Sequence, residues 1–106
     1  MKLYSTQSYK IRANRGRPRV WIEGKRLVAA GFSRGLRFNV VVKPSNAVLL
    51  RFAIAENGSR KVSGKGERPI IDIVGTLLEQ SGLKSGDHVS INYSQNMIEI
   101  EAVDHA

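Results

Sequence analysis

The sequence predicts a mainly β domain with short helices, in which two tandem β-α-β-β repeats form a pseudo-dimer around a shared β-barrel. Three observations predict this class. The chain has 106 residues, which is the size of one small domain. Two stretches of the chain align with each other. Within each stretch, apolar residues alternate with polar ones, as they do along half-buried strands.

The internal repeat becomes visible when the sequence is shifted by 51 positions against itself. Glycines of the first stretch then align with glycines of the second, and apolar residues align with apolar residues, which chance alignment seldom produces. The matched pairs include Lys10 with Lys61, Arg17 with Arg68, Ile22 with Ile73, Gly24 with Gly75, Leu27 with Leu78, Gly31 with Gly82 and Gly35 with Gly86. After a one-residue deletion in a turn, Val48 matches Ile98 and Leu50 matches Ile100. We interpret the two stretches as copies of one supersecondary unit.

Each copy is predicted to form a strand, a short helix, a second strand, a hairpin turn and a third strand. Alternation indicates the strands, and a glycine at each end delimits the helix because glycine best adopts the left-handed conformation that follows a helix. The expected elements are 19–23, 24–31, 36–42 and 47–52 in the first copy, and 70–74, 75–82, 87–93 and 97–102 in the second.

One copy has too few apolar faces to enclose a core, so two copies are expected to share one. We therefore predict a single domain over 1–106, with the basic repeat one at 10–52, a linker at 53–60 and repeat two at 61–102. The flanking residues 1–9 and 103–106 are expected to be frayed.

Positive charge is concentrated in the first half of the chain. The sequence contains 17 Lys and Arg against nine Asp and Glu, a net charge of +8. Residues 1–50 hold eleven basic residues and only Glu23 as an acid, whereas residues 51–106 hold six basic and eight acidic residues. Such a surface is typical of proteins that bind polyanions, although a basic segment that only keeps the chain in solution is the alternative.

Composition excludes several classes. The chain has no cysteine, so disulfides, thiolate metal sites and cysteine nucleophiles are absent. Its apolar stretches are too short to span a bilayer, and no signal-peptide pattern opens the sequence. We expect a cytoplasmic, nucleoid-associated protein without a membrane partner.

Basic residues without a basic counterpart in repeat two are the best candidates for nucleic-acid contacts. Arg12, Arg15 and Arg19 belong to this group, whereas Arg17 recurs as Arg68 and has an equally good structural interpretation. Lys25 and Arg26 stand at a helix start, where the helix dipole disfavours cations unless an anion binds nearby. The full predicted site is Lys10, Arg12, Arg15, Arg17, Arg19, Trp21, Lys25, Arg26, Arg34 and Arg37.

Other side chains give weaker signals. Trp21 is expected to face outward, where it would stack on a base or pack under the preceding arm or in a subunit interface. His88 and His105 lack neighbours that would make a metal or catalytic site, so we predict no enzyme, metal or cofactor. The acidic residues of repeat two could be a solvated face, or could meet the basic half of a neighbouring molecule in a homodimer.

The stretch 19–32, with its Gly-Lys-x-Leu and Ala-Gly-Phe motifs followed by Gly35, resembles the SymE-like toxin family. That family belongs to the AbrB/MazE class of swapped-hairpin proteins. Repeat two keeps the skeleton as Gly75, Leu78, Gly82 and Gly86. The resemblance implies a barrel of interleaved hairpins, DNA binding, and for SymE a toxin role on RNA.

Three functions follow from the sequence. The leading one is a small transcription regulator of the AbrB-like type that binds double-stranded DNA with the basic arm and first helix. The second is a SymE-like toxin that acts on RNA. The third is an antitoxin or inhibitor module whose basic face binds an acidic protein.

Overall fold

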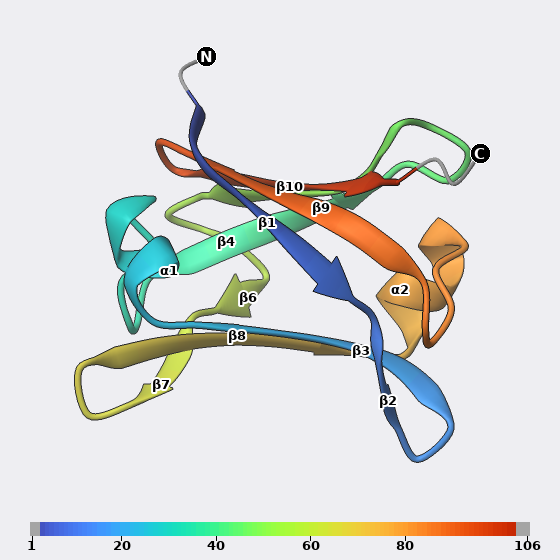
Figure 1. The fold of residues 1–106 in the computed structure, drawn as a ribbon. Coiled ribbons are helices and arrows are strands. Elements are labelled where there is room, and N and C mark those ends of the chain that lie inside the picture. Colours follow the sequence, from blue (N-terminus) through green and yellow to red (C-terminus); the bar gives the residue numbers. More distant parts are fainter. Residues whose placement is uncertain (1–2, 104–106) are drawn as a thin grey trace.

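Two antiparallel sheets face each other across one apolar core, and two short helices lie at opposite ends of the space between them (Figure 1). The computed structural model describes residues 3–103. Sheet A has the strand order β1 (Leu3–Lys10), β9 (His88–Ser94), β10 (Met97–Ala102), β5 (Val48–Ile54), β4 (Arg37–Val42) and β6 (Arg60–Lys61). Sheet B has the order β2 (Arg12–Asn14), β3 (Arg17–Glu23), β8 (Arg68–Val74) and β7 (Ser63–Lys65).

The strand order is symmetric about the centre of each sheet. In sheet A, β5 pairs with β10, and Leu50 lies opposite Ile100. In sheet B, β3 pairs with β8, and Trp21 lies opposite Asp72. Both pairs join positions that correspond in the internal alignment. The two halves of the chain are therefore related by a pseudo-twofold axis that passes through the middle of both sheets.

On the two central strands of sheet B, the alternating apolar residues face the core, as the alternation predicts. Val20 and Ile22 on β3 face the core with Ile71 and Ile73 on β8, and none of the four is more than 3% exposed. Phe38, Phe52 and Ile91 cover them from sheet A. Because residues of both halves of the chain belong to the same apolar cluster, the two halves share one core.

The helices are α1 (Lys25–Ala29) and α2 (Thr76–Ser81). Helices of five and six residues are not stable alone, so their packing holds them: Leu27 and Leu78 are fully buried. As predicted, the left-handed glycines Gly31 and Gly82 follow them. Neither of these helices, the only two in the described part of the chain, has the length or the apolar character needed to cross a bilayer.

The predicted closed barrel is wrong, because the described strands form two separate sheets. The chain passes from one sheet to the other at Ile11 and at Val62, and both residues bond to loops instead of continuing a ladder. Ile11 donates its N–H to the Asp87 carbonyl oxygen at 2.8 Å, and Val62 donates to Leu36 at 2.8 Å. Hydrogen-bonded pairing therefore stops at both corners.

Two segments outside the predicted elements are ordered in sheet A. Part of the stretch expected to be frayed forms β1, which pairs with β9 from Leu3 to Lys10. The expected linker 53–60 contains the end of β5 and the start of β6, with Gly58 buried between them. Residues 1–2 and 104–106, also expected to be frayed, lie outside the described residues.

Burial of Tyr93 makes the stability of the fold depend on pH. Its ring is 1% exposed and its hydroxyl donates to Gln7 Oε1 at 2.7 Å. Burial raises the pKa of Tyr93 to about 12. Between about pH 10 and about pH 12, the unfolded chain therefore loses a proton that the folded chain keeps. The free energy of unfolding should fall by up to about 3 kcal/mol over this range.

Urea denaturation at a series of alkaline pH values measures this loss. Tyr93→Phe removes the titrating group, so the variant should show a shallower decline than the wild type. Identical slopes in the two proteins would show that the phenol does not titrate in this way.

Candidate nucleic-acid interface

The outer surface of sheet B carries four of the ten predicted binding residues, which are Arg12, Arg17, Arg19 and Trp21. Because Val20 and Ile22 face the core, the alternate residues of β3 face away from it. The register places Arg12 of β2 opposite Arg19, and Lys65 of β7 opposite Arg68. We call this surface the sheet B face. Its outward residues are Arg12, Asn14, Arg17, Arg19, Trp21, Glu23, Ser63, Lys65, Arg68, Ile70, Asp72 and Val74.

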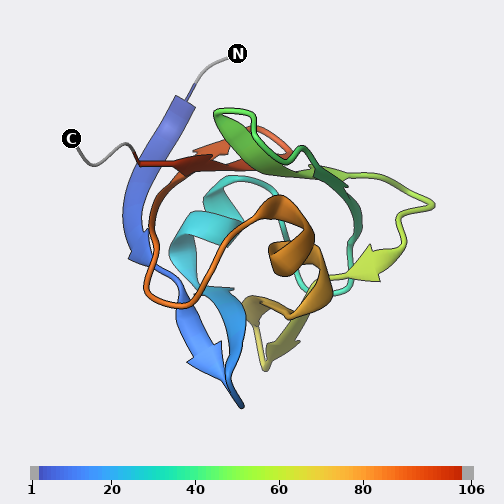
Figure 2. The same cartoon turned by 90° about the vertical axis from the view of Figure 1, so that its right-hand side faces the viewer.

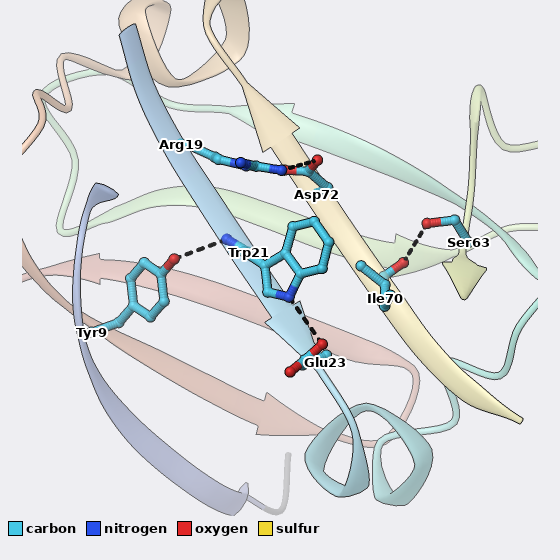
Figure 3. A network of polar contacts seen from close by, with 7 residues as sticks. All are labelled: Tyr9, Arg19, Trp21, Glu23, Ser63, Ile70 and Asp72. Atoms are coloured by element: carbon cyan, nitrogen blue, oxygen red, sulfur yellow. Dashed lines mark hydrogen bonds and ion pairs between the residues drawn. The ribbon is translucent and has the colours of Figure 1, made fainter. Parts of the chain in front are cut away.

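An arginine, a tryptophan and an aspartate meet at the centre of the face, on the pseudo-twofold axis (Figure 3). Arg19 donates from Nε and Nη2 to the two carboxylate oxygens of Asp72, each at 2.9 Å. The Arg19 guanidinium carbon also lies 4.9 Å from the centre of the Trp21 ring. The hydrogen bond to Asp72 raises the pKa of Arg19. The guanidinium is therefore fixed over an aromatic ring in a bidentate ion pair.

Glu23 connects the two central strands next to this cluster. One carboxylate oxygen accepts from Trp21 Nε1 at 3.0 Å, and the other accepts from Arg68 Nη2 at 3.1 Å. These hydrogen bonds lower the pKa of Glu23, and the bond from Trp21 contributes most to this shift. The carboxylate therefore stays ionised and holds the edge of the indole ring in place (Figure 3).

A groove of about 520 Å³ separates β1 from the sheet B face. Tyr9, which is 8% exposed, crosses beneath it and accepts a hydrogen bond from the Trp21 backbone N–H at 2.9 Å (Figure 3). Lys10, Arg12 and Arg68 line the groove together with Trp21. The Arg12 guanidinium carbon lies 5.8 Å from the centre of the Tyr9 ring. The groove thus combines basic and aromatic side chains, with Glu23 as its acid.

Arg17 connects the sheet B face to the other half of the molecule. Its Nη2 donates to Glu79 Oε1 at 2.6 Å and to Thr76 Oγ1 at 3.3 Å, both on α2. The hydrogen bond between Arg17 and Glu79 raises the pKa of Arg17 and lowers the pKa of Glu79. The guanidinium also lies directly over Gly75. These contacts favour the structural interpretation of Arg17.

The structure brings together six of the predicted site residues, which are Lys10, Arg12, Arg15, Arg17, Arg19 and Trp21. Arg15 lies at the tip of the turn from β2 to β3. Lys25 lies at the far end of the face, where it lines a shallow hollow with Arg68. Arg34 reaches the β7 edge, where its Nη1 donates to the Gly66 carbonyl oxygen at 2.6 Å.

The remaining two predicted residues are neither in sheet B nor among the residues that line the hollows beside it. Arg26 is on α1, and Arg37 is on β4 of sheet A, where its Nη1 donates to the Gly58 carbonyl oxygen at 3.3 Å. Reasoning from the sequence also missed Lys65 and Arg68, which repeat two contributes to the sheet B face. The match of Arg68 with Arg17 in the internal alignment was the signal that pointed to one of them.

Five basic side chains around the face are available for a ligand. Within the described part of the chain, Lys10, Arg12, Arg15, Lys25 and Lys65 make no side-chain hydrogen bond or ion pair. In contrast, Arg17, Arg19 and Arg68 each bind a carboxylate. The face therefore combines cations without a carboxylate partner and cations that each bind a carboxylate, and of the latter Arg19 lies at its centre.

Residues 3–103 contain no group of three histidine, aspartate or glutamate side chains placed to hold a metal ion. His105 lies outside the described residues. Comparison of the chain with protein-family models, with curated proteins and with solved structures finds no match.

Two glycines at equivalent places in the repeat test the position of Arg17. Gly75 has a φ of 78° and a ψ of −113° and lies under the Arg17 guanidinium. Gly24 has a φ of 87° and a ψ of −144°, and the nearest atom to an added Cβ is Arg68 Nη2 at 3.5 Å. Alanine at either position should cost about 1–3 kcal/mol through the strained backbone conformation. Gly75→Ala should cost more, because the new methyl group displaces the guanidinium from Glu79. Urea denaturation of both variants measures the difference, and equal losses would contradict this placement of Arg17.

Proposed function

We propose that this protein binds double-stranded DNA through the sheet B face and acts as a small transcription regulator. The observation that carries the proposal is the alternation of β3 and its neighbours, which collects basic residues and one tryptophan on one side of a rigid sheet. Phosphate contacts supply most of the affinity of such surfaces for DNA, whereas base contacts supply specificity.

The free cations at the rim are suited to phosphate contacts. Lys10, Arg12 and Arg15 follow one another along the segment from the end of β1 through β2 to the turn before β3. They can therefore contact neighbouring phosphates of one DNA strand. Lys25 and Lys65 extend this positive surface to the opposite end of the face. These side chains have no carboxylate partner to give up when they bind.

Arg19, the paired cation at the centre of the face, is suited to a phosphate contact for which Asp72 competes. Exposed ion pairs contribute little free energy because water competes with them. A phosphate that approaches Arg19 can therefore replace Asp72 as its partner at small cost. Asp72 also repels the approaching phosphate. Nonspecific binding at Arg19 is therefore weaker than it would be if Asp72 were absent.

We further propose that the fold is an AbrB-like swapped-hairpin arrangement within one chain. Its support is the order strand, helix, strand, strand, which occurs twice, and the pairing of β3 in one half with β8 in the other. Relatives implied by the resemblance usually build this arrangement from two chains. In this protein, the divergence between the halves would make the binding surface asymmetric.

The salt dependence of DNA binding tests the proposal. If about six phosphates are neutralised, log affinity for duplex DNA should fall with log salt at a slope of about −5. The double variant Arg12→Ala/Arg15→Ala should reduce the magnitude of the slope by about 2. Fluorescence anisotropy of a labelled duplex over a salt series measures both quantities.

Lys43→Ala/Lys84→Ala is the matched control, because it removes the same charge from exposed positions outside sheet B. The control should keep the wild-type slope. Absence of duplex binding, or equal effects of the two double variants, would overturn the assignment of the sheet B face.

Neutralising Asp72 should strengthen DNA binding. Asp72→Asn removes the carboxylate that holds Arg19, which adds about one phosphate contact and raises affinity about fivefold near physiological salt. Glu99→Gln removes the equivalent carboxylate from the Arg51 ion pair on sheet A and should change affinity little. The same anisotropy assay compares them, and weaker binding by Asp72→Asn would show that Arg19 works only when Asp72 orients it.

RNA is the second candidate ligand, and the partial exposure of Trp21 on the face favours it. Single-stranded bases stack on exposed aromatic rings, whereas a duplex keeps its bases stacked internally. Trp21 is the single tryptophan of the chain, so its fluorescence reports on the face directly. Stronger quenching by single-stranded RNA than by duplex DNA at equal saturation would favour the RNA-binding function.

A further inference from the structure

Strand β1 forms one end of sheet A and pairs on one side only. It pairs with β9 over seven register positions from Leu3 to Lys10. Its other side lies at the outer edge of the sheet, where no strand of the described chain is paired with it (Figure 2). The edge is long, because β1 has eight residues.

The direction of the backbone groups on β1 follows from the antiparallel pattern. Ile11 donates its N–H toward the β9 side, to Asp87. In an antiparallel ladder, alternate residues point both backbone groups to the same neighbour, so Tyr9 and Gln7 bond to β9 as well. The N–H and C=O groups of Thr6 and Ser8 therefore point away from sheet A.

From Ser5 to Tyr9, this edge lacks the features that usually prevent strands from pairing between molecules. Natural edge strands are kept apart by charged residues, proline, bulges or short length. The residues from Leu3 to Tyr9 include neither a charged residue nor a proline, and the only irregularity in their pairing is between Leu3 and Ser5. Tyr4 adds a large side chain that is 44% exposed.

The opposite end of sheet A has a different character. There β6 covers only Arg37 and Phe38 of β4, and the uncovered part of β4 leads into Lys43. Arg37, Arg60 and Lys61 add further positive charge beside it. In a protein with a net charge of +8, these basic side chains disfavour a second copy at that edge, whereas the stretch of β1 from Leu3 to Tyr9, which precedes Lys10, has no charge of its own.

We propose that two copies of this protein associate by antiparallel pairing of β1 with β1, which joins two A sheets into one. In the proposed register, the uncharged stretch from Leu3 to Tyr9 of one copy pairs over its full length with the same stretch of the other copy. This register places Thr6 on the twofold axis. Tyr4 of each copy then lies opposite Ser8 of the other. Thr6 is the midpoint of the stretch, and its backbone groups have the outward direction that such pairing requires.

The association does not depend on nucleic acid, so it can be tested without any. Wild-type protein in sedimentation equilibrium should show a mass that rises with concentration from 11.7 kDa toward twice that value. One strand pair is a small interface, so we expect dissociation in the micromolar range. A wild-type mass that stays monomeric over this range would overturn the proposal.

Charge placed on the axis gives the decisive experiment. Thr6→Lys and Thr6→Glu each put like charges opposite each other in a homodimer, so each variant alone should be monomeric. An equal mixture puts Lys opposite Glu and should restore the dimer. If each variant still dimerises alone, or if the mixture stays monomeric, Thr6 does not lie on the axis and the proposed pairing is wrong.

Val41→Lys and Val41→Glu are the matched controls. Val41 is 45% exposed on β4, so these changes alter net charge equally without touching β1. Both should dimerise like the wild type. The Thr6 variants should fold, because the Thr6 side chain is exposed and its hydroxyl donates to Asn92 Oδ1 at the sheet surface. Circular dichroism and urea denaturation check this.

Discussion

The pairing of β3 with β8 is the interaction on which the rest of the structure depends. It places Trp21 opposite Asp72 on the pseudo-twofold axis and turns Val20, Ile22, Ile71 and Ile73 toward sheet A. Without it, each half would expose an apolar strand face that its own residues cannot cover. Pairing of β5 with β10 repeats the constraint in sheet A. The two halves can therefore fold only together.

This constraint also separates what the sequence predicts from what it cannot. Strands β3, β4, β8 and β9 were predictable because buried residues recur at every second position, which local alternation records. Strand β1 was not, since its residues Tyr4 to Ser8 are uniformly polar or aromatic and carry no alternation of hydropathy. It is held by ladder bonds to β9 and by the buried ring of Tyr9, neither of which a local pattern reveals.

The candidate site shows the same division. The absence of basic counterparts in repeat two predicted Arg12, Arg15 and Arg19 as binding residues, and the alternation of β3 predicted that Trp21 faces outward. The partners of these residues depend on the register between strands far apart in sequence. A shift of one residue between β3 and β8 would put Asp72 on a different neighbour and break the bidentate pair with Arg19. No composition argument could supply that register.

Divergence between the halves explains how one scaffold can carry a specialised face. Most positions that face the core are apolar in both halves. An exception is Ala30, whose counterpart Ser81 is buried and donates its hydroxyl to the Leu78 carbonyl oxygen at 2.6 Å. Outward positions are free of that restriction, and there Trp21 and Asp72 have become different residues at equivalent places. A symmetric pair at the axis would have placed two like side chains against each other. The asymmetry allows Asp72 to hold Arg19 over the Trp21 ring at the junction between the halves.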